Sequence, residues 1–453
     1  MTTHHRGNFS SRMGIILATA GSAVGLGNIW RFPYMTGMNG GAAFILIYAV
    51  CVLMLGIPGM VAEFVVGRYS ASNAAGAYNK LAGRTPWRVI GYLGVLTSMI
   101  ILGFYAVVAG WCLQYLLASV IGHLEGDTNY VVSYFQQFAA HPWKPVVWAV
   151  AFIGVTHLVV ARGVRDGIEK ASKLLMPTLF VLLLLLIAAS CMLPGAIKGV
   201  EFLFKPDFGK VTHSVFLEAL GQAFFSLSLG TACLCTYASY FTKETRLVGS
   251  AVQIAFIDSI IAILAGLMIF PAAFSVGVAP DSGPSLIFIT LPNVFHEAFA
   301  SMPVVGYVIS ILFYALLSLA ALTSTISMHE IGTAFFHEEF HISRNAGAWV
   351  VTACCSVIAV FCSLSQGVLA GAKVMGMSIL DACDALTAQI MLPVGALLTC
   401  LFVGWYVPAK VVREQVTNWG ALPVALYRVF LFFIRFICPV CIVAVFLHQL
   451  GVF

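Results

Sequence analysis

Long apolar segments separated by short polar ones run along almost the whole chain. Eleven of them are long enough to cross about 30 Å of hydrocarbon as helices, and their expected limits are 13–37, 42–67, 88–121, 146–162, 167–193, 216–240, 247–277, 303–336, 346–364, 376–406 and 425–450. The apolar stretch 283–300 is shorter and bounded by prolines, so we expect a loop helix over the extracellular face there. The pattern predicts an all-α polytopic membrane protein.

The first span contains residues that an ordinary membrane anchor would avoid. Within 18–33, ATAGSAVGLGNIWRFP, Gly21, Gly25 and Gly27 each weaken a helix by about 1 kcal/mol relative to alanine. Arg31 costs about 2.5–3.5 kcal/mol at membrane depth. Broken helix is tolerated at that depth only where it lines a cavity or is buried in protein. We therefore expect this segment to unwind around a bound solute.

The sixth span has a similar interruption. Its stretch 222–231, QAFFSLSLGT, places Ser226, Ser228 and Gly230 near the middle of the membrane. The first and sixth spans correspond to each other if spans one to five and six to ten are two inverted halves. Paired interrupted helices at such positions indicate a midplane site of a secondary transporter. We therefore expect helices 1 and 6 to be unwound, and the eleventh span would be an addition outside such a repeat.

Composition and charge support a membrane protein and predict its orientation. Of 453 residues, 60% are hydrophobic and 9% charged, with a mean hydropathy of +0.97, whereas soluble domains carry about 25% charged residues. With the N-terminus in the cytoplasm, sixteen basic residues are cytoplasmic and five external, as the positive-inside tendency requires; the C-terminus is then outside. The net charge of +5 is spread over short loops, so we expect no nucleic-acid partner.

Several motifs point to one family. They are AGSAVGLGNIWRFPY (20–34), NGGAAF (39–44), EFVVGR (63–68), KLLMPTLF (173–180), GQAFFSLSLG (221–230), TYASY (236–240), ITLP (289–292) and LTSTIS (322–327). The chain resembles the neurotransmitter:sodium symporter family in its bacterial amino-acid branch. The resemblance implies a five-plus-five inverted repeat with helices 1 and 6 unwound and one extra C-terminal helix. It also implies sodium-coupled import of a neutral amino acid by alternating access, in a bacterial inner membrane, with no organic cofactor; monomer and homodimer stay open.

The same resemblance implies a division of the chain. Residues 1–12 form a cytoplasmic segment with a gate, 13–193 the first repeat, 194–215 an extracellular loop, 216–406 the second repeat, and 407–453 a cytoplasmic loop with the last span.

Two sodium sites follow from the resemblance. The first would use the Ala23 carbonyl, Asn28, Ser226 and Asp258, completed by the substrate carboxylate; the second would use the carbonyls of Gly21, Val24 and Ala320 with the hydroxyls of Thr323 and Ser324. The alternative for these hydroxyls is hydrogen bonding between helices.

In chloride-dependent relatives an anion is held by side chains that match Tyr48, Gln222 and Ser226. Asp258 would replace that anion here, so we expect chloride-independent transport, unless Asp258 is a structural acid.

The resemblance also places the substrate. Its carboxylate would meet the amides of Leu26 and Gly27 and the Tyr105 hydroxyl, and its ammonium would meet Ala23, Phe225, Ser226 and Ser228, while Ile101, Phe225, Thr231, Ser327 and Met328 would line a neutral side-chain pocket. Monoamine carriers of the family have an aspartate at the position of Gly25. Its absence favours an α-amino acid, and Thr231 leaves room for a hydrophobic or aromatic side chain.

Gates and competing functions complete the hypothesis. Arg31 and Asp384 match an extracellular gate above Tyr105 and Phe225, and Glu338 matches an inner gate opposite Arg6, near Phe9 and Tyr240. Glu63 is expected to bind free amides of an unwound helix.

The sequence His337-Glu-Glu-Phe-His341 fits the HExxH zinc-protease pattern, so a membrane zinc protease is one alternative. A substrate-gated channel or sensor is another.

Overall fold

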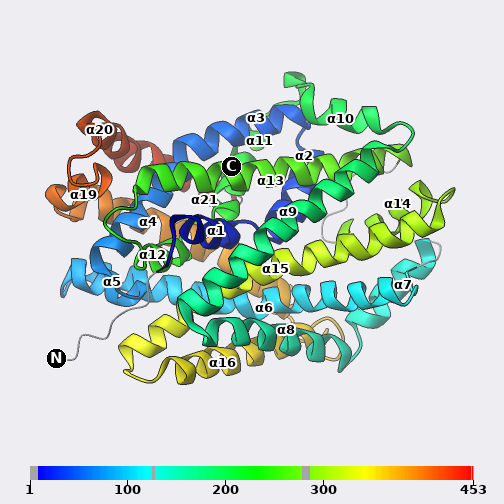
Figure 1. Cartoon of the computed structure of the whole chain (residues 1–453), viewed down its shortest axis with the longest axis horizontal. Coiled ribbons are helices and arrows are strands. Elements are labelled where there is room, and N and C mark those ends of the chain that lie inside the picture. Colours follow the sequence, from blue (N-terminus) through cyan, green and yellow to red (C-terminus); the bar gives the residue numbers. More distant parts are fainter. Residues whose placement is uncertain (1–8, 125–127, 278–285, 450, 452–453) are drawn as a thin grey trace.

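The computed structural model describes residues 9–124, 128–277, 286–449 and 451. Within these ranges the chain is almost entirely helical, and its extended pairing is an isolated β-bridge between Val374 and Met377. Most long helices run along the long axis of an elongated bundle (Figure 1). Short helices α5 (Ala74–Ala82), α19 (Ala409–Val416) and α20 (Val424–Phe432) lie at one end, and α7 (Thr128–Ala139), α10 (Ala196–Phe204) and α14 (Leu291–Ala298) lie toward the other.

Nine helical segments among the described residues are long and apolar enough to cross a membrane. They are α3–α4 (Ala42–Ser70), α6 (Val89–Val120, from Pro86 with its first turn), α8 (Lys144–Ala161), α9 (Lys170–Cys191, from Val164 with η4), α13 (Leu247–Ser275), α15 (Pro303–Glu339), α16 (Arg344–Leu364), α17–α18 (Ile379–Tyr406) and α20–α21 (Val424–Gln449). Wide π-helical turns separate α3 (Ala42–Cys51) from α4 (Ile57–Ser70), α17 (Ile379–Ala385) from α18 (Leu392–Leu401), and α20 from α21 (Cys438–Gln449).

The two remaining expected spans are the interrupted ones. The first consists of α1 (Arg12–Ala23) followed by η1 and α2, which together cover Gly27–Met38. The two parts are bent by 55° relative to each other, and counted as one span they make a tenth membrane crossing. The sixth consists of α11 (His213–Ser226) and α12 (Cys233–Ala238), separated by residues 227–232. The expected interruption of span 216–240 is present, and three residues within it, Ser228, Gly230 and Ala232, have positive φ.

Burial separates central from peripheral helices. In the most apolar window of α6, 72% of residues are buried, against 28% in α9 and in α20–α21. The exposed residues of α9 include Leu174, Val181 and Leu185, which suits a helix that faces lipid tails. The interrupted segments pack among the central helices, so their unpaired backbone groups are enclosed by protein.

The short helices were mostly missed by the apolar pattern. The expected loop helix at 283–300 is present as a wide turn, Leu286–Thr290, followed by α14; residues 283–285 lie outside the described part. Helix α14 buries Leu291, Val294 and Phe295 on one face, the 3.6-residue spacing of an amphipathic helix. By contrast, α5, α7, α10 and α19 are 8 to 12 residues long, and runs of that length are not distinguished from loops by span-length criteria.

Candidate functional site

The break in the first segment is set by its glycines. Helix α1 ends at Ala23, and Val24 is extended, with ψ 108°. A Cβ atom on Gly25 would lie 2.3 Å from the Ser324 hydroxyl oxygen and 3.1 Å from the Tyr105 hydroxyl. A Cβ atom on Gly27 would lie 3.0 Å from the Phe225 ring. The backbone of this break therefore contacts α6, α11 and α15 at distances that only glycine permits.

The break in the sixth segment is held open by a carboxylate. Ser228 and Gly230 have φ values of 54° and 82°, and a Cβ atom on Gly230 would lie 2.4 Å from the Leu392 carbonyl oxygen. The buried Glu63 of α4 accepts hydrogen bonds from the backbone amides of Gly230 (2.8 Å) and Cys235 (3.3 Å). The expected role of Glu63 is confirmed: it satisfies amides that a continuous helix would have satisfied.

Asp258 of α13 lies at the meeting point of three segments. Its Oδ1 accepts from Asn28 Nδ2 at 2.7 Å, and its Oδ2 accepts from the hydroxyls of Ser226 (2.7 Å) and Tyr48 (3.3 Å). All four side chains are buried. Asn28 Oδ1 in turn accepts from the Gly25 amide at 3.0 Å. The structure thus brings together the three side chains expected at the first sodium site, with the buried Ala23 at the adjoining end of α1.

Gln222 differs from the other residues expected at the chloride-like position. It is fully buried, but neither its amide nitrogen nor its amide oxygen makes a hydrogen bond within the described part of the chain. The hydroxyls of Tyr48 and Ser226 are both directed to Asp258.

The residues expected at the second sodium site also converge. The Thr323 hydroxyl lies 3.1 Å from the Val24 carbonyl oxygen and 2.9 Å from that of Ala320, and the Ser324 hydroxyl lies 3.5 Å from Val24. Gly21 is adjacent, with its Cβ position 3.5 Å from Thr323 Cβ. Both hydroxyls thus donate from α15 to the carbonyl of Val24, which is the interhelical hydrogen bonding given above as the alternative to a sodium site. The hydroxyl and carbonyl oxygens together form one buried cluster.

The expected substrate residues surround both breaks. The Leu26 amide donates to the Tyr105 hydroxyl at 3.1 Å, which unites two residues expected at the substrate carboxylate. The Ser228 hydroxyl donates to the Ser22 carbonyl (3.3 Å), and the Thr231 hydroxyl to the Ser228 carbonyl (2.7 Å). The remaining expected pocket residues are buried or half-buried: Ile101, Phe225, Ser327 and Met328.

The expected outer gate pair is not formed. The guanidinium of Arg31 lies 4.3 Å from the centroid of the Phe225 ring, a cation–π contact. Asp384 is exposed on α17. Among the ion pairs of the described residues, which extend to 4.0 Å, none joins these two side chains.

The expected inner gate is described only in part, because Arg6 lies outside the described residues. Glu338 accepts from the backbone amide (2.7 Å) and side chain (3.0 Å) of Asn73, at the start of α5. The Phe9 ring centroid is 6.0 Å from that of Tyr240, so these two residues are neighbours as expected. The Tyr240 hydroxyl donates to a different acid, Glu330, at 2.6 Å.

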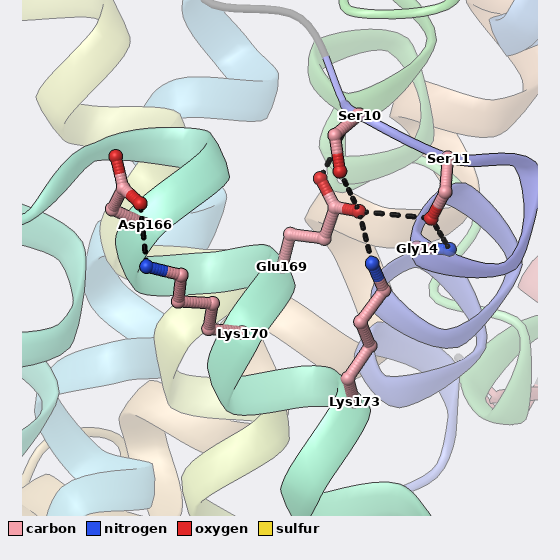
Figure 2. Close-up of polar contacts among 7 residues, drawn as sticks. All are labelled: Ser10, Ser11, Gly14, Asp166, Glu169, Lys170 and Lys173. Atoms are coloured by element: carbon pink, nitrogen blue, oxygen red, sulfur yellow. Dashed lines mark hydrogen bonds and ion pairs between the residues drawn. The ribbon is translucent and has the colours of Figure 1, made fainter.

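Two charged sites at the end of the bundle that carries Glu338 were missed by the sequence interpretation. Buried Glu330 forms an ion pair with Arg344 at the start of α16. A carboxylate inside an apolar span is a functional candidate by default, and that rule would have identified Glu330. The second site is Glu169, the last residue of η4 (Val164–Glu169), which Figure 2 shows beside the start of α1.

Glu169 holds the segment that precedes α1. It accepts from the Ser10 amide and hydroxyl, both at 2.7 Å, from the Ser11 hydroxyl at 3.0 Å, and from Lys173 at 2.6 Å (Figure 2). Ser11 also caps α1 by accepting from the Gly14 amide at 3.0 Å. One buried carboxylate thus joins the start of the first segment to the fifth.

The HExxH pattern is not arranged as a zinc site. Helix α15 ends at Glu339, and His341 lies beyond it with φ 55°. Because an HExxH site needs both histidines one turn apart on a helix, this geometry does not form it. His337 Nδ1 lies 2.6 Å from the Ile342 carbonyl oxygen. The structure therefore argues against the zinc-protease alternative.

Comparison with known proteins agrees with this geometry. The profile of the sodium:neurotransmitter symporter family matches residues 6–134 and 132–453. The chain belongs to this family. A protein of Bacillus subtilis (strain 168), described as an uncharacterized sodium-dependent transporter, is 38% identical over 448 residues, which are 98% of each chain. A sodium- and chloride-dependent GABA transporter 2 of Macaca fascicularis is 25% identical over 64% of this chain and 55% of its own length.

A solved member of the family gives the same fold. The crystal structure of MhsT in complex with L-phenylalanine matches with a TM-score of 0.88 and 41% sequence identity, over 98% of this chain and 100% of that chain. The chain is therefore a multi-span, sodium-dependent membrane transporter of the symporter family and not an enzyme. Its paired helix breaks are the interrupted first and sixth segments of that fold.

Proposed function

We propose that this protein imports a neutral α-amino acid together with sodium, without chloride, across a bacterial inner membrane. The observation that carries the substrate class is the packing around Gly25. An acidic side chain at this position, which would hold an amine, would require the Ser324 hydroxyl to move, because the Cβ atom alone would lie 2.3 Å from it. A substrate must then supply its own carboxylate, beside the Leu26 amide and the Tyr105 hydroxyl.

Sodium suits both oxygen clusters. Carboxylate, amide, hydroxyl and carbonyl oxygens are ligands for hard cations, and each cluster combines such oxygens with an unwound backbone. Asn28, Ser226, Asp258 and the Ala23 carbonyl would hold one ion. Thr323, Ser324 and the carbonyls of Gly21, Val24 and Ala320 would hold the second. A substrate carboxylate shared with the first ion couples the two affinities, and such coupling is reciprocal.

Chloride independence is supported by the hydrogen bonds of Asp258. The hydroxyls of Tyr48 and Ser226, which would hold an anion in chloride-dependent relatives, both donate to its Oδ2. The carboxylate supplies a fixed negative charge beside the proposed first ion. Transport measured with gluconate in place of chloride should be unchanged, and a collapse of transport would contradict the proposal.

A hydrophobic or aromatic substrate side chain is favoured by the lining. Ile101, Phe225, Thr231, Ser327 and Met328 are all uncharged. MhsT, which is 41% identical, was crystallised with L-phenylalanine. The charge bias along the chain supports an inward N-terminus, so the end with Glu169 and Glu338 is assigned to the cytoplasm and the end with Asp384 to the outside.

Uptake into proteoliposomes tests the function. An inward sodium gradient should drive accumulation above equilibrium, and dissipating the gradient should abolish it. Competition by each of the twenty amino acids against a bound radiolabelled amino acid, read by scintillation proximity, identifies the substrate. Flux without accumulation above equilibrium would instead support the channel or sensor alternative.

A further inference from the structure

Two thiols face each other at the end of the bundle that carries Asp384. The sulfur of Cys362, in the last turn of α16, lies 3.9 Å from the sulfur of Cys383 in α17. Cys362 is fully buried and Cys383 is half-buried. Cys383 directly precedes Asp384, the acid expected at the outer gate.

Polar contacts keep these two helices in register. The Leu380 amide donates to the Ser365 hydroxyl at 3.3 Å, and Gln366 Nε2 donates to the Ser378 hydroxyl at 3.2 Å. Ser378 also caps α17 by accepting from the Asp381 amide at 3.1 Å. The thiols therefore face each other across a helix contact that has further hydrogen bonds within a few residues, and their sulfur atoms are already 3.9 Å apart.

We propose that Cys362 and Cys383 form a reversible disulfide that fixes α17 to α16 and slows the outer gate. The inference rests on the proposed function for the orientation of the chain and the gating role of Asp384. Disulfides persist in extracytoplasmic, oxidising compartments. Arg31 and Asp384 are not paired in this structure, so gate closure requires the two side chains to approach, and a covalent tie on α17 opposes that movement.

The accessible thiol reacts first. The Cys383 thiol loses its proton to water, and its thiolate attacks one sulfur of a low-molecular-weight disulfide such as oxidised glutathione. That disulfide bond breaks, and one glutathione leaves as a thiol. The Cys362 thiolate then attacks the Cys383 sulfur and releases the second glutathione. The Cys362 thiol also gives its proton to water before this attack. In total the protein loses two protons and two electrons, and the reagent takes up both as it is reduced to two thiols.

Peptide mapping of the full-length protein tests the bond. Oxidised glutathione should join the Cys362 and Cys383 peptides with the loss of two hydrogens, and dithiothreitol should separate them. Exposed Cys191 is the internal control, because its conversion to a mixed disulfide shows that the reagent is active. Modified Cys191, with Cys362 and Cys383 left unjoined, would overturn the proposal.

Uptake in the same proteoliposomes tests the consequence. Oxidation should remove most sodium-dependent uptake by the wild type, and dithiothreitol should restore it. Cys383→Ser, at the half-exposed position, and Cys362→Ala should both resist oxidation, whereas Cys191→Ser should behave as the wild type. A joined pair with unchanged uptake would overturn the gating role. Absence of sodium-dependent uptake in the reduced protein would instead contradict the proposed function, while the peptide map still decides the bond.

Discussion

Asp258 receives hydrogen bonds from Asn28, Ser226 and Tyr48, which belong to three different segments. Hydrogen bonds to charged groups contribute about 1.5–3 kcal/mol each. We expect Asp258→Asn to lower sodium-dependent uptake in gluconate by about tenfold or more, and added chloride to restore part of it if the anion can replace the lost charge. Uptake assays with both anions measure this effect.

The matched control is Asp381→Asn, which removes an exposed carboxylate on α17. It should leave uptake unchanged. Full activity of Asp258→Asn in gluconate would show that transport does not need the negative charge of Asp258.

Gly25 gives a second prediction at this scale. Its Cβ position is 2.3 Å from the Ser324 oxygen, and overpacking of this kind costs about 1–3 kcal/mol. Gly25→Ala should weaken amino-acid binding in the scintillation assay by about tenfold or more. Gly154→Ala is the control, because nothing lies within 4 Å of that Cβ position. Equal binding by the two variants would contradict close packing at Gly25.

The clustering of many proposed site residues could be predicted from sequence, because motif resemblance carries residue types and positions; their roles stay predictions. Contacts such as Glu169 with Ser10 could not, since these residues are 159 positions apart and neither interrupts an apolar run. The pairing state of Arg31 also depends on the conformation of the gate, which the sequence does not specify.

Among the elements, the junction between α1 and α9 depends on one buried carboxylate. Glu169→Gln keeps the shape but removes the charge that binds Lys173, so we expect the segment before α1 to open more often. Hydrogen exchange of residues 9–14 should become faster. Asp166→Asn breaks a neighbouring exposed ion pair, Asp166–Lys170, and serves as the control. Equal exchange in both variants would show that Glu169 does not hold the segment.

Element types were predicted well where a run was long, and poorly where it was short. All nine continuous spans coincide with long apolar runs, because length alone distinguishes them. The helix breaks were predicted from the cost of glycine and hydroxyl residues at membrane depth. The width of the breaks was not predicted. Ser228 and Ala232 have φ values of 54° and 61°, which serine and alanine rarely adopt.

For the whole molecule, the charge bias gives a testable topology. In right-side-out vesicles, a membrane-impermeant thiol reagent should label Lys198→Cys, near the start of α10, before lysis. It should label Lys80→Cys, in α5, only after lysis. Native cysteines are the background in both variants, so labelling is compared with the wild type. The reverse pattern would invert the proposed orientation.

The hydrogen bonds from Ser10 and Ser11 to Glu169 have a consequence for how α1 can move. Helix α1 has 12 residues and is therefore about 18 Å long, with Glu169 near its first residue and the Asn28–Asp258 contact just beyond its last. If the far end acts as a pivot, a tilt of about 10° displaces the first residue by about 3 Å, roughly a full hydrogen-bond length. Such a tilt would break the Ser10 and Ser11 contacts together. The start of α1 would then lose its three hydrogen bonds to Glu169 in one step.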